Sequence, residues 1–194
     1  IWLLTIALAS LVLFQIHFEI PGIGGVINVN LADPFALFAL AILLQEVVQR
    51  RSLPAWRIPG FNISLLIISA MLVFGFFHAL PETGVTSWAL GSRLLGWVVI
   101  LGYLSAGYLI VSHLGQQGLR RFTENILVVI VVIVVVQIIV RVSEFYYDTD
   151  LGLLTAPRFD GYAANRNAFA FQLLVVLSFI LAYSFENGSV FFIF

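Results

Sequence analysis

Long apolar runs separated by short polar stretches set the pattern of this chain. A helix needs about 20 mostly apolar residues to cross the hydrocarbon core of a bilayer, and these runs approach or reach that length. The pattern therefore predicts about six complete spans and the start of a seventh. The expected spans are Ile1–Phe18, Leu31–Val48, Ile63–Leu80, Trp88–Ser112, Phe122–Val140 and Ala168–Tyr183, and the partial one begins near Ser189.

Two of the expected spans carry a further signal. The run Ile126–Val136 is almost entirely Val and Ile, which in water would indicate a buried strand. Lipid offers no partner to an open strand, so a spanning helix is favoured there. Gly102 and Ala106 are four residues apart, a spacing that lets the backbones of two helices approach closely.

The composition agrees with a membrane protein. Hydrophobic residues make up 61% of the chain, charged residues 10%, and the mean hydropathy is +1.07. A soluble domain carries about 25% charged residues. We therefore expect an all-α, polytopic transmembrane helix bundle, with residues 1–194 forming one transmembrane domain. Because the chain begins without methionine and stops inside an apolar run, we expect it to be a fragment of a longer protein.

Charge and cysteine content exclude some classes of function. The formal net charge is −1 and no basic patch is interleaved with aromatic residues, so no nucleic-acid partner is expected. The chain has no cysteine, which excludes disulfides, thiolate metal sites and cysteine nucleophiles within it.

The arginines predict the orientation of the spans, since all nine Lys and Arg residues are arginine. Cytoplasmic loops carry an excess of basic residues. Alternating the expected spans puts five arginines on one side and four on the other, so the side with five is predicted to be cytoplasmic. The loop Arg141–Arg166 is then on the outer side of the membrane. The five are Arg50, Arg51, Arg57, Arg120 and Arg121, and the four are Arg93, Arg141, Arg158 and Arg166.

A polar stretch before the sixth expected span is the candidate site. The amides that open a helix are unpaired and carry partial positive charge, and neighbouring arginines add full charge. Arginine also contacts two phosphate oxygens at once through its planar guanidinium. The stretch therefore predicts a site for an anion such as a lipid-linked phosphate. Its polar residues are Arg158, Asp160, Asn165, Arg166 and Asn167.

Each of these residues also has a simpler interpretation. Arg158 and Arg166 would serve equally as interface anchors or as partners of Asp160. Asn165 suits a helix N-cap as well as a ligand contact. Gly161 is expected to supply a backbone bend. Arg141, at a helix end, and Arg93, one turn inside the fourth span, complete the set as anchors or as further diphosphate contacts.

A metal site is not expected. The three histidines are scattered and no pair has the i, i+4 spacing of metal ligands. Asp148, Asp150 and Asp160 lie in a soluble, turn-like loop, where solvation explains carboxylates without a cation. No cofactor is expected either.

The segment RFDGYAANRN, from Arg158 to Asn167, resembles the Arg-x-x-Gly…Asn-x-Asn signature of the O-antigen ligase and polymerase superfamily. Asn30, Asp33 and Pro34, which open the second expected span within a series of short-looped helices, are similar in layout to the N-terminal half of that family. The specific motif covers about ten residues, and the rest agrees in layout rather than in sequence.

The resemblance implies a GT-C-like inner-membrane glycosyltransferase with roughly ten to fourteen spans. Its donor would be a glycan on undecaprenyl diphosphate, and its acceptor lipid A–core, another glycan or a protein. Arg158, Asn165 and Asn167 match the motif positions. The family acts at the periplasmic face without nucleotide sugar or metal. Its further arginine and its histidine, the proposed general base on a large periplasmic loop, match nothing in these residues, so no catalytic residue is assigned.

Two other classes stay open. An outer pocket lined by arginines would also suit a transporter or flippase for a lipid or a bicarbonate-like anion, for which inverted repeats and broken helices near the midplane are typical. A structural subunit of a membrane complex needs only lipid-facing apolar helices, and the clustered outer arginines count against it.

Overall fold

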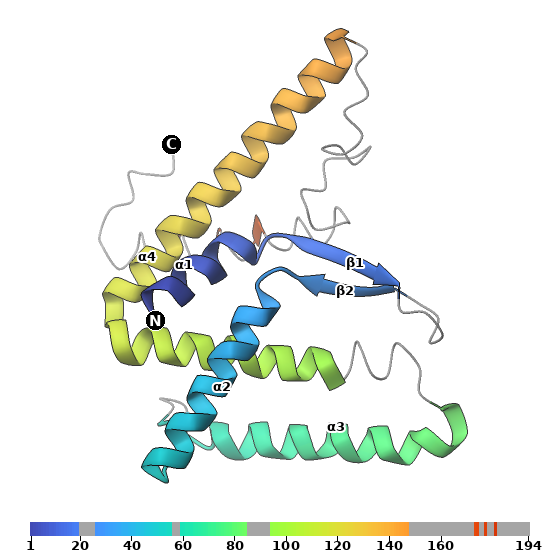
Figure 1. The fold of residues 1–194 in the computed structure, drawn as a ribbon, viewed down its shortest axis with the longest axis vertical. Coiled ribbons are helices and arrows are strands. Elements are labelled where there is room, and N and C mark those ends of the chain that lie inside the picture. Colours follow the sequence, from blue (N-terminus) through green and yellow to red (C-terminus); the bar gives the residue numbers. More distant parts are fainter. Residues whose placement is uncertain are drawn as a thin grey trace. The chain divides into compact units, whose positions relative to one another are not determined.

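The computed structural model describes residues 1–19, 26–55, 59–84 and 94–147, together with residues 173, 174, 177 and 181. These residues are mostly helical, which confirms the helical part of the predicted fold class. In chain order the elements are α1 (Trp2–Leu11), β1 (Gln15–Glu19), β2 (Val26–Asn30), α2 (Asp33–Arg50), α3 (Phe61–Thr83) and α4 (Gly96–Tyr147) (Figure 1).

Two of the described helices are long and apolar enough to cross a membrane. They are α3 over Phe61–Glu82 and α4 over Gly96–Ser143, with mean hydropathies of 2.3 and 3.1. The expected six complete spans and a seventh are therefore not supported. Each difference has a local cause in the sequence.

The first expected span is wrong in its second half. The helix ends at Leu11, and β1 and β2 form a two-stranded sheet on either side of residues 20–25 (Figure 1). Both strands alternate apolar and polar residues, QIHFE and VINVN, which is the two-residue period of a strand rather than the period of a helix. Asn30 ties the hairpin to both flanking helices. Its side-chain NH₂ donates to the Val12 carbonyl, and its Oδ1 accepts the amide of Ala32 at 2.9 Å.

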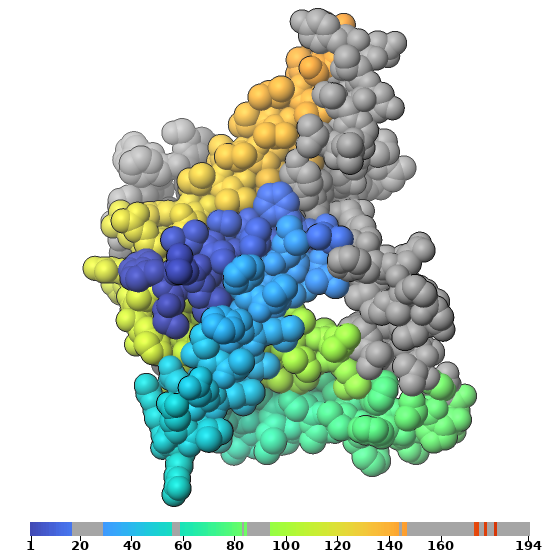
Figure 2. All heavy atoms as spheres, viewed as in Figure 1, coloured from blue at the N-terminus to red at the C-terminus, as the bar shows by residue number. Residues whose placement is uncertain are grey.

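The second and third expected spans are confirmed as helices, and they differ in polarity. α2 carries Asp33, Glu46 and Arg50 within 18 residues, and ionisable groups are costly inside a bilayer. α3 is mostly apolar over Phe61–Glu82, with a mean hydropathy of 2.3, none of its most apolar stretch is buried within the protein, and its length is exposed in Figure 2. Only α3 of these two has the character of a span.

The fourth and fifth expected spans correspond to two helical stretches of α4 that meet at a kink. The backbone is non-helical at Gly115, with φ 57° and ψ −143°, inside the connection that was expected over residues 113–121. Residues 116–121, which were expected in that connection, are helical. A positive φ of this kind suits glycine because it has no Cβ. We call residues 96–113 the first arm of α4 and residues 116–147 the second arm. The expected sixth span and the start of the seventh lie almost entirely outside the described residues.

The chain divides into two compact units, each with its own packing. One unit contains α2, α3 and the first arm. Within it, a Cβ on Gly102 would lie 2.7 Å from the carbonyl carbon and oxygen of Ala36, so α2 and α4 meet backbone to backbone. The spacing of Gly102 and Ala106 predicted this close packing, and Ala106 is buried as well.

The other unit contains α1 and the second arm. Its core is built from larger side chains. Ala9 and Leu13 pack with Ile126, Ile130 and Ile133, all of them buried. The Val- and Ile-rich run is thus helical, as lipid surroundings favour, and supplies the apolar face against which α1 packs.

Candidate functional site

Most of the predicted anion site falls on residues that the structure does not describe. Arg141 is the member of the predicted set that lies within the described chain. The residues outside it are Arg93, Arg158, Gly161, Asn165, Arg166 and Asn167.

Arg141 does not begin a loop, as the sequence suggested. α4 continues to Tyr147, so Arg141 lies within the helix, more than one turn before its end, and is half-buried. Its neighbour Val140 is buried, while Ile139 and Val142 are exposed. The expected outer loop therefore does not begin at Arg141, because α4 continues to Tyr147 and the residues that follow Arg141 are helical.

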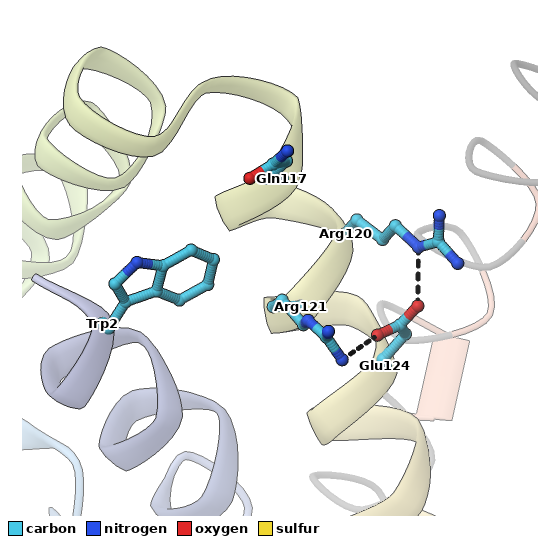
Figure 3. A pocket seen from close by; sticks show the side chains of 5 residues that line it. All are labelled: Trp2, Gln117, Arg120, Arg121 and Glu124. Atoms are coloured by element: carbon cyan, nitrogen blue, oxygen red, sulfur yellow. Dashed lines mark hydrogen bonds and ion pairs between the residues drawn. The ribbon is translucent and has the colours of Figure 1, made fainter.

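A pocket of about 570 Å³ lies beside the polar start of the second arm. It is lined by Trp2, Gln117, Arg120, Arg121 and Glu124, all of which belong to the same compact unit. α1 supplies the indole of Trp2, and consecutive turns of α4 supply the four polar side chains (Figure 3).

Glu124 holds both arginines of the pocket. The Arg120 Nε donates to Glu124 Oε1 at 2.7 Å, and an Arg121 NH donates to Glu124 Oε2 at 3.3 Å (Figure 3). The residues are four and three positions apart, the spacings at which side chains meet on one helix face. The side chains of Arg120 and Arg121 are 63% and 66% exposed. Two cations and one carboxylate leave one net positive charge.

This pocket was not predicted from the sequence. Arg120 and Arg121 were interpreted only as loop charges that set the orientation of the spans in the membrane. The Arg120-x-x-x-Glu124 spacing was the available signal, but it required the segment to be helical. The sequence does not indicate that Trp2 lines the same pocket, because Trp2 and Gln117 are separated by most of the described chain.

A second polar cluster lies in the unit that contains α2 and the first arm. His113 Nε2 lies 3.3 Å from Glu46 Oε1, and Glu46 Oε2 lies 3.5 Å from Arg50. Ser112 Oγ lies 3.1 Å from His113 Nδ1, so a hydroxyl, an imidazole and a carboxylate follow one another. However, the Ser112 hydroxyl donates to the Leu109 carbonyl at 3.3 Å, and His113 Nδ1 is 3.1 Å from the same oxygen. These contacts to the helix backbone favour a structural link between α2 and α4 over an activated nucleophile.

The described residues contain no group of three or more His, Cys, Asp or Glu side chains that could hold a metal ion. The loop carboxylates Asp148, Asp150 and Asp160 lie outside those residues.

Comparison of the chain with protein-family models, with curated proteins and with solved structures finds no match. A functional proposal for this chain therefore rests on its own residues and on the resemblance that they carry.

Proposed function

We propose that this chain is part of an inner-membrane glycosyltransferase of the O-antigen ligase or polymerase kind. In this proposal the protein transfers or extends a glycan carried on undecaprenyl diphosphate at the periplasmic face. Arg158 and Arg166 bind the diphosphate, Asn165 and Asn167 contact it or cap the helix, and Gly161 makes the bend between them. The single observation behind the proposal is the segment RFDGYAANRN running into an apolar stretch.

The chemistry of such a transfer suits these residue types. Cleavage of the bond between the sugar and the diphosphate leaves negative charge on the departing phosphate. Fixed cations and helix N-terminal amides stabilise that charge more in the transition state than in the ground state, which lowers the barrier. A separate general base activates the acceptor hydroxyl. The segment supplies residues that would stabilise the negative charge on the departing phosphate.

The apolar helices support a lipid-linked donor. α3 exposes apolar side chains along its spanning part, including Leu66 and Phe74 at 70% and 72%, and such a surface needs lipid or apolar protein around it. A substrate with a polyprenyl chain reaches its enzyme from within the bilayer. Arg141 in α4, together with Arg93, would then be further cations for the diphosphate.

A transporter of an anionic solute or lipid is the second candidate, because α4 is broken at Gly115 and broken helices are typical of transporters. The position of the break argues against a midplane binding site. The first arm is about 27 Å long at 1.5 Å per residue, which nearly crosses the hydrocarbon core. Gly115 is followed by Gln116, Gln117 and the arginine pair, so the break falls in a polar stretch between two apolar arms.

Binding of undecaprenyl diphosphate to the purified full-length protein tests the proposal. We expect Arg158→Ala to weaken binding about 30-fold, because a charge-assisted hydrogen bond contributes about 2 kcal/mol. Arg158→Lys should recover only part of that loss, since lysine cannot contact two oxygens through one planar group. Arg51→Ala is the matched control, as it removes one exposed arginine at the side predicted to be cytoplasmic.

Unchanged binding in both Arg158 variants would make this residue an interface anchor and would remove the main support for a transferase. Undiminished binding of the lipid together with uptake of a free anion by proteoliposomes would instead favour the transporter.

A further inference from the structure

The pocket of Trp2, Gln117, Arg120, Arg121 and Glu124 has no part in the proposed glycan transfer, and it belongs to a different set of residues. We propose that it binds the phosphate headgroup of an anionic phospholipid. The argument rests on its place along the chain, its charge and the apolar surface beside it.

The polarity of α4 places this pocket at headgroup depth. The first arm and the run Ile126–Val136 are apolar, while the stretch between them contains Gln117, Arg120, Arg121 and Glu124. When apolar arms of this length lie in the hydrocarbon, the polar stretch that joins them comes to the bilayer surface. Tryptophan favours the same depth because its ring is apolar and its N–H is polar, and Trp2 is 43% exposed.

The charge of the pocket fits a phosphodiester. Two guanidinium groups and one carboxylate leave one positive charge, which matches the single negative charge of a phosphatidylglycerol headgroup. Arg120 and Arg121 both donate to Glu124, at 2.7 Å and 3.3 Å, so the two guanidinium groups lie close together. Arginine contacts phosphate oxygens through more than one N–H, and both arginine side chains are largely exposed.

The apolar residues beside the pocket favour a lipid over free phosphate. Leu3 adjoins Trp2 in α1 and is 84% exposed, and Leu119 adjoins Arg120 in α4 and is 40% exposed. Acyl chains would cover these side chains while the headgroup occupies the pocket. At about 570 Å³, the pocket falls within the size range of roughly 300–1,000 Å³ that is usual for small-molecule sites.

Native mass spectrometry of the full chain in detergent tests the proposal, with phosphatidylglycerol and phosphatidylcholine as probes. We expect preferential binding of phosphatidylglycerol, weakened about fivefold by Arg120→Gln or by Arg121→Gln, since each basic residue at a membrane surface contributes about 1 kcal/mol. Glu124→Gln should strengthen binding about fivefold, because it removes the carboxylate that competes with the lipid for both guanidinium groups. A gain of this kind cannot arise from unfolding.

Arg50→Gln is the matched control. Arg50 is 66% exposed and pairs with Glu46 at i, i+4, as Arg120 pairs with Glu124, but it lies in α2. Equal losses in Arg50→Gln and Arg121→Gln, or no gain in Glu124→Gln, would overturn the proposal in favour of general charge attraction. Displacement of the lipid by millimolar inorganic phosphate with the same variant profile would overturn the choice of a lipid.

Discussion

The two arms of α4 are continuous in sequence, yet they pack by different means. The first arm meets α2 through Gly102 and the buried alanines Ala36 and Ala106, so that backbone lies against backbone. The second arm meets α1 through Ile126, Ile130 and Ile133, whose branched side chains fill the space between the helices. One contact depends on the absence of side-chain volume and the other on its presence.

This difference bears on helix association in a bilayer, since two of the described helices are long and apolar enough to cross one. Lipid tails are as apolar as Leu or Ile, so burial of apolar surface contributes little to helix association within a bilayer. Close van der Waals packing and hydrogen bonds between helices drive the association instead. Close approach also brings polar groups together. In the unit of the first arm, Tyr103 donates to Asp33 at 2.9 Å and the Trp97 indole N–H donates to Ser69 Oγ at 2.8 Å.

The largest effect is expected where the first arm touches α2. Gly102→Leu places a Cβ 2.7 Å from backbone atoms of Ala36, which cannot rotate away, so α2 and α4 must separate. We expect a loss of about 3 kcal/mol in the free energy of unfolding. Denaturation in mixed micelles, followed by circular dichroism, measures it. Gly107→Leu is the control, since nothing lies within 4 Å of a Cβ there, and equal losses in both variants would contradict the backbone contact.

A smaller loss in the free energy of unfolding is expected for a substitution in the second arm. Ile133→Ala leaves a cavity in the cluster with Ala9 and Leu13, and the free energy of unfolding should fall by about 2 kcal/mol. Ile138→Ala removes the same atoms from a side chain that is 52% exposed, and should change stability little. The same unfolding measurement applies. If Ile138→Ala costs as much as Ile133→Ala, the packing of α1 on this arm is not what stabilises it.

The smallest effect on stability is expected for the hydrogen bond between Tyr103 in the first arm and Asp33 in α2. Tyr103→Phe keeps the ring but removes the hydroxyl that donates to Asp33, and we expect a loss of about 1 kcal/mol. Tyr146→Phe, at an exposed position near the end of the second arm, is the control and should be neutral. A loss near zero for Tyr103→Phe would mean that its hydrogen bond to Asp33 does not help to hold α2 to the first arm.

Parts of the fold followed from local sequence. The positions of α2 and α3 were predicted within a few residues, because each is a single apolar run with polar residues at both ends. The prediction of the first span was wrong in its second half because it relied on the number of apolar residues there. The alternation of apolar and polar residues, which is typical of a strand, was given too little weight. Gln15, His17 and Glu19 occupy every second position, and the Pro- and Gly-rich residues that follow suit a hairpin.

Of the two candidate sites, one was predicted from the sequence and the other was found only in the structure. The anion-binding segment around Arg158 is a prediction from neighbouring residues and stays one, since it lies outside the described chain. The pocket around Glu124 was not predicted, because it needs a helical segment where glycines and charges suggested a loop. It also needs Trp2, which comes from the other end of the described chain.

By itself, the sequence determined the apolar, helical character of the chain, the places of α2 and α3, and the close-packing role of Gly102. These properties depend on composition and on residues within one or two turns of each other. Only the tertiary structure decided that two helices join directly at a kink at Gly115, that Gln15–Glu19 pairs with Val26–Asn30, and that Trp2 lines a pocket with an arginine pair. The physical reason is that backbone hydrogen bonds and side-chain contacts between distant residues compete with local preference, and their outcome depends on which surfaces the folded chain brings together.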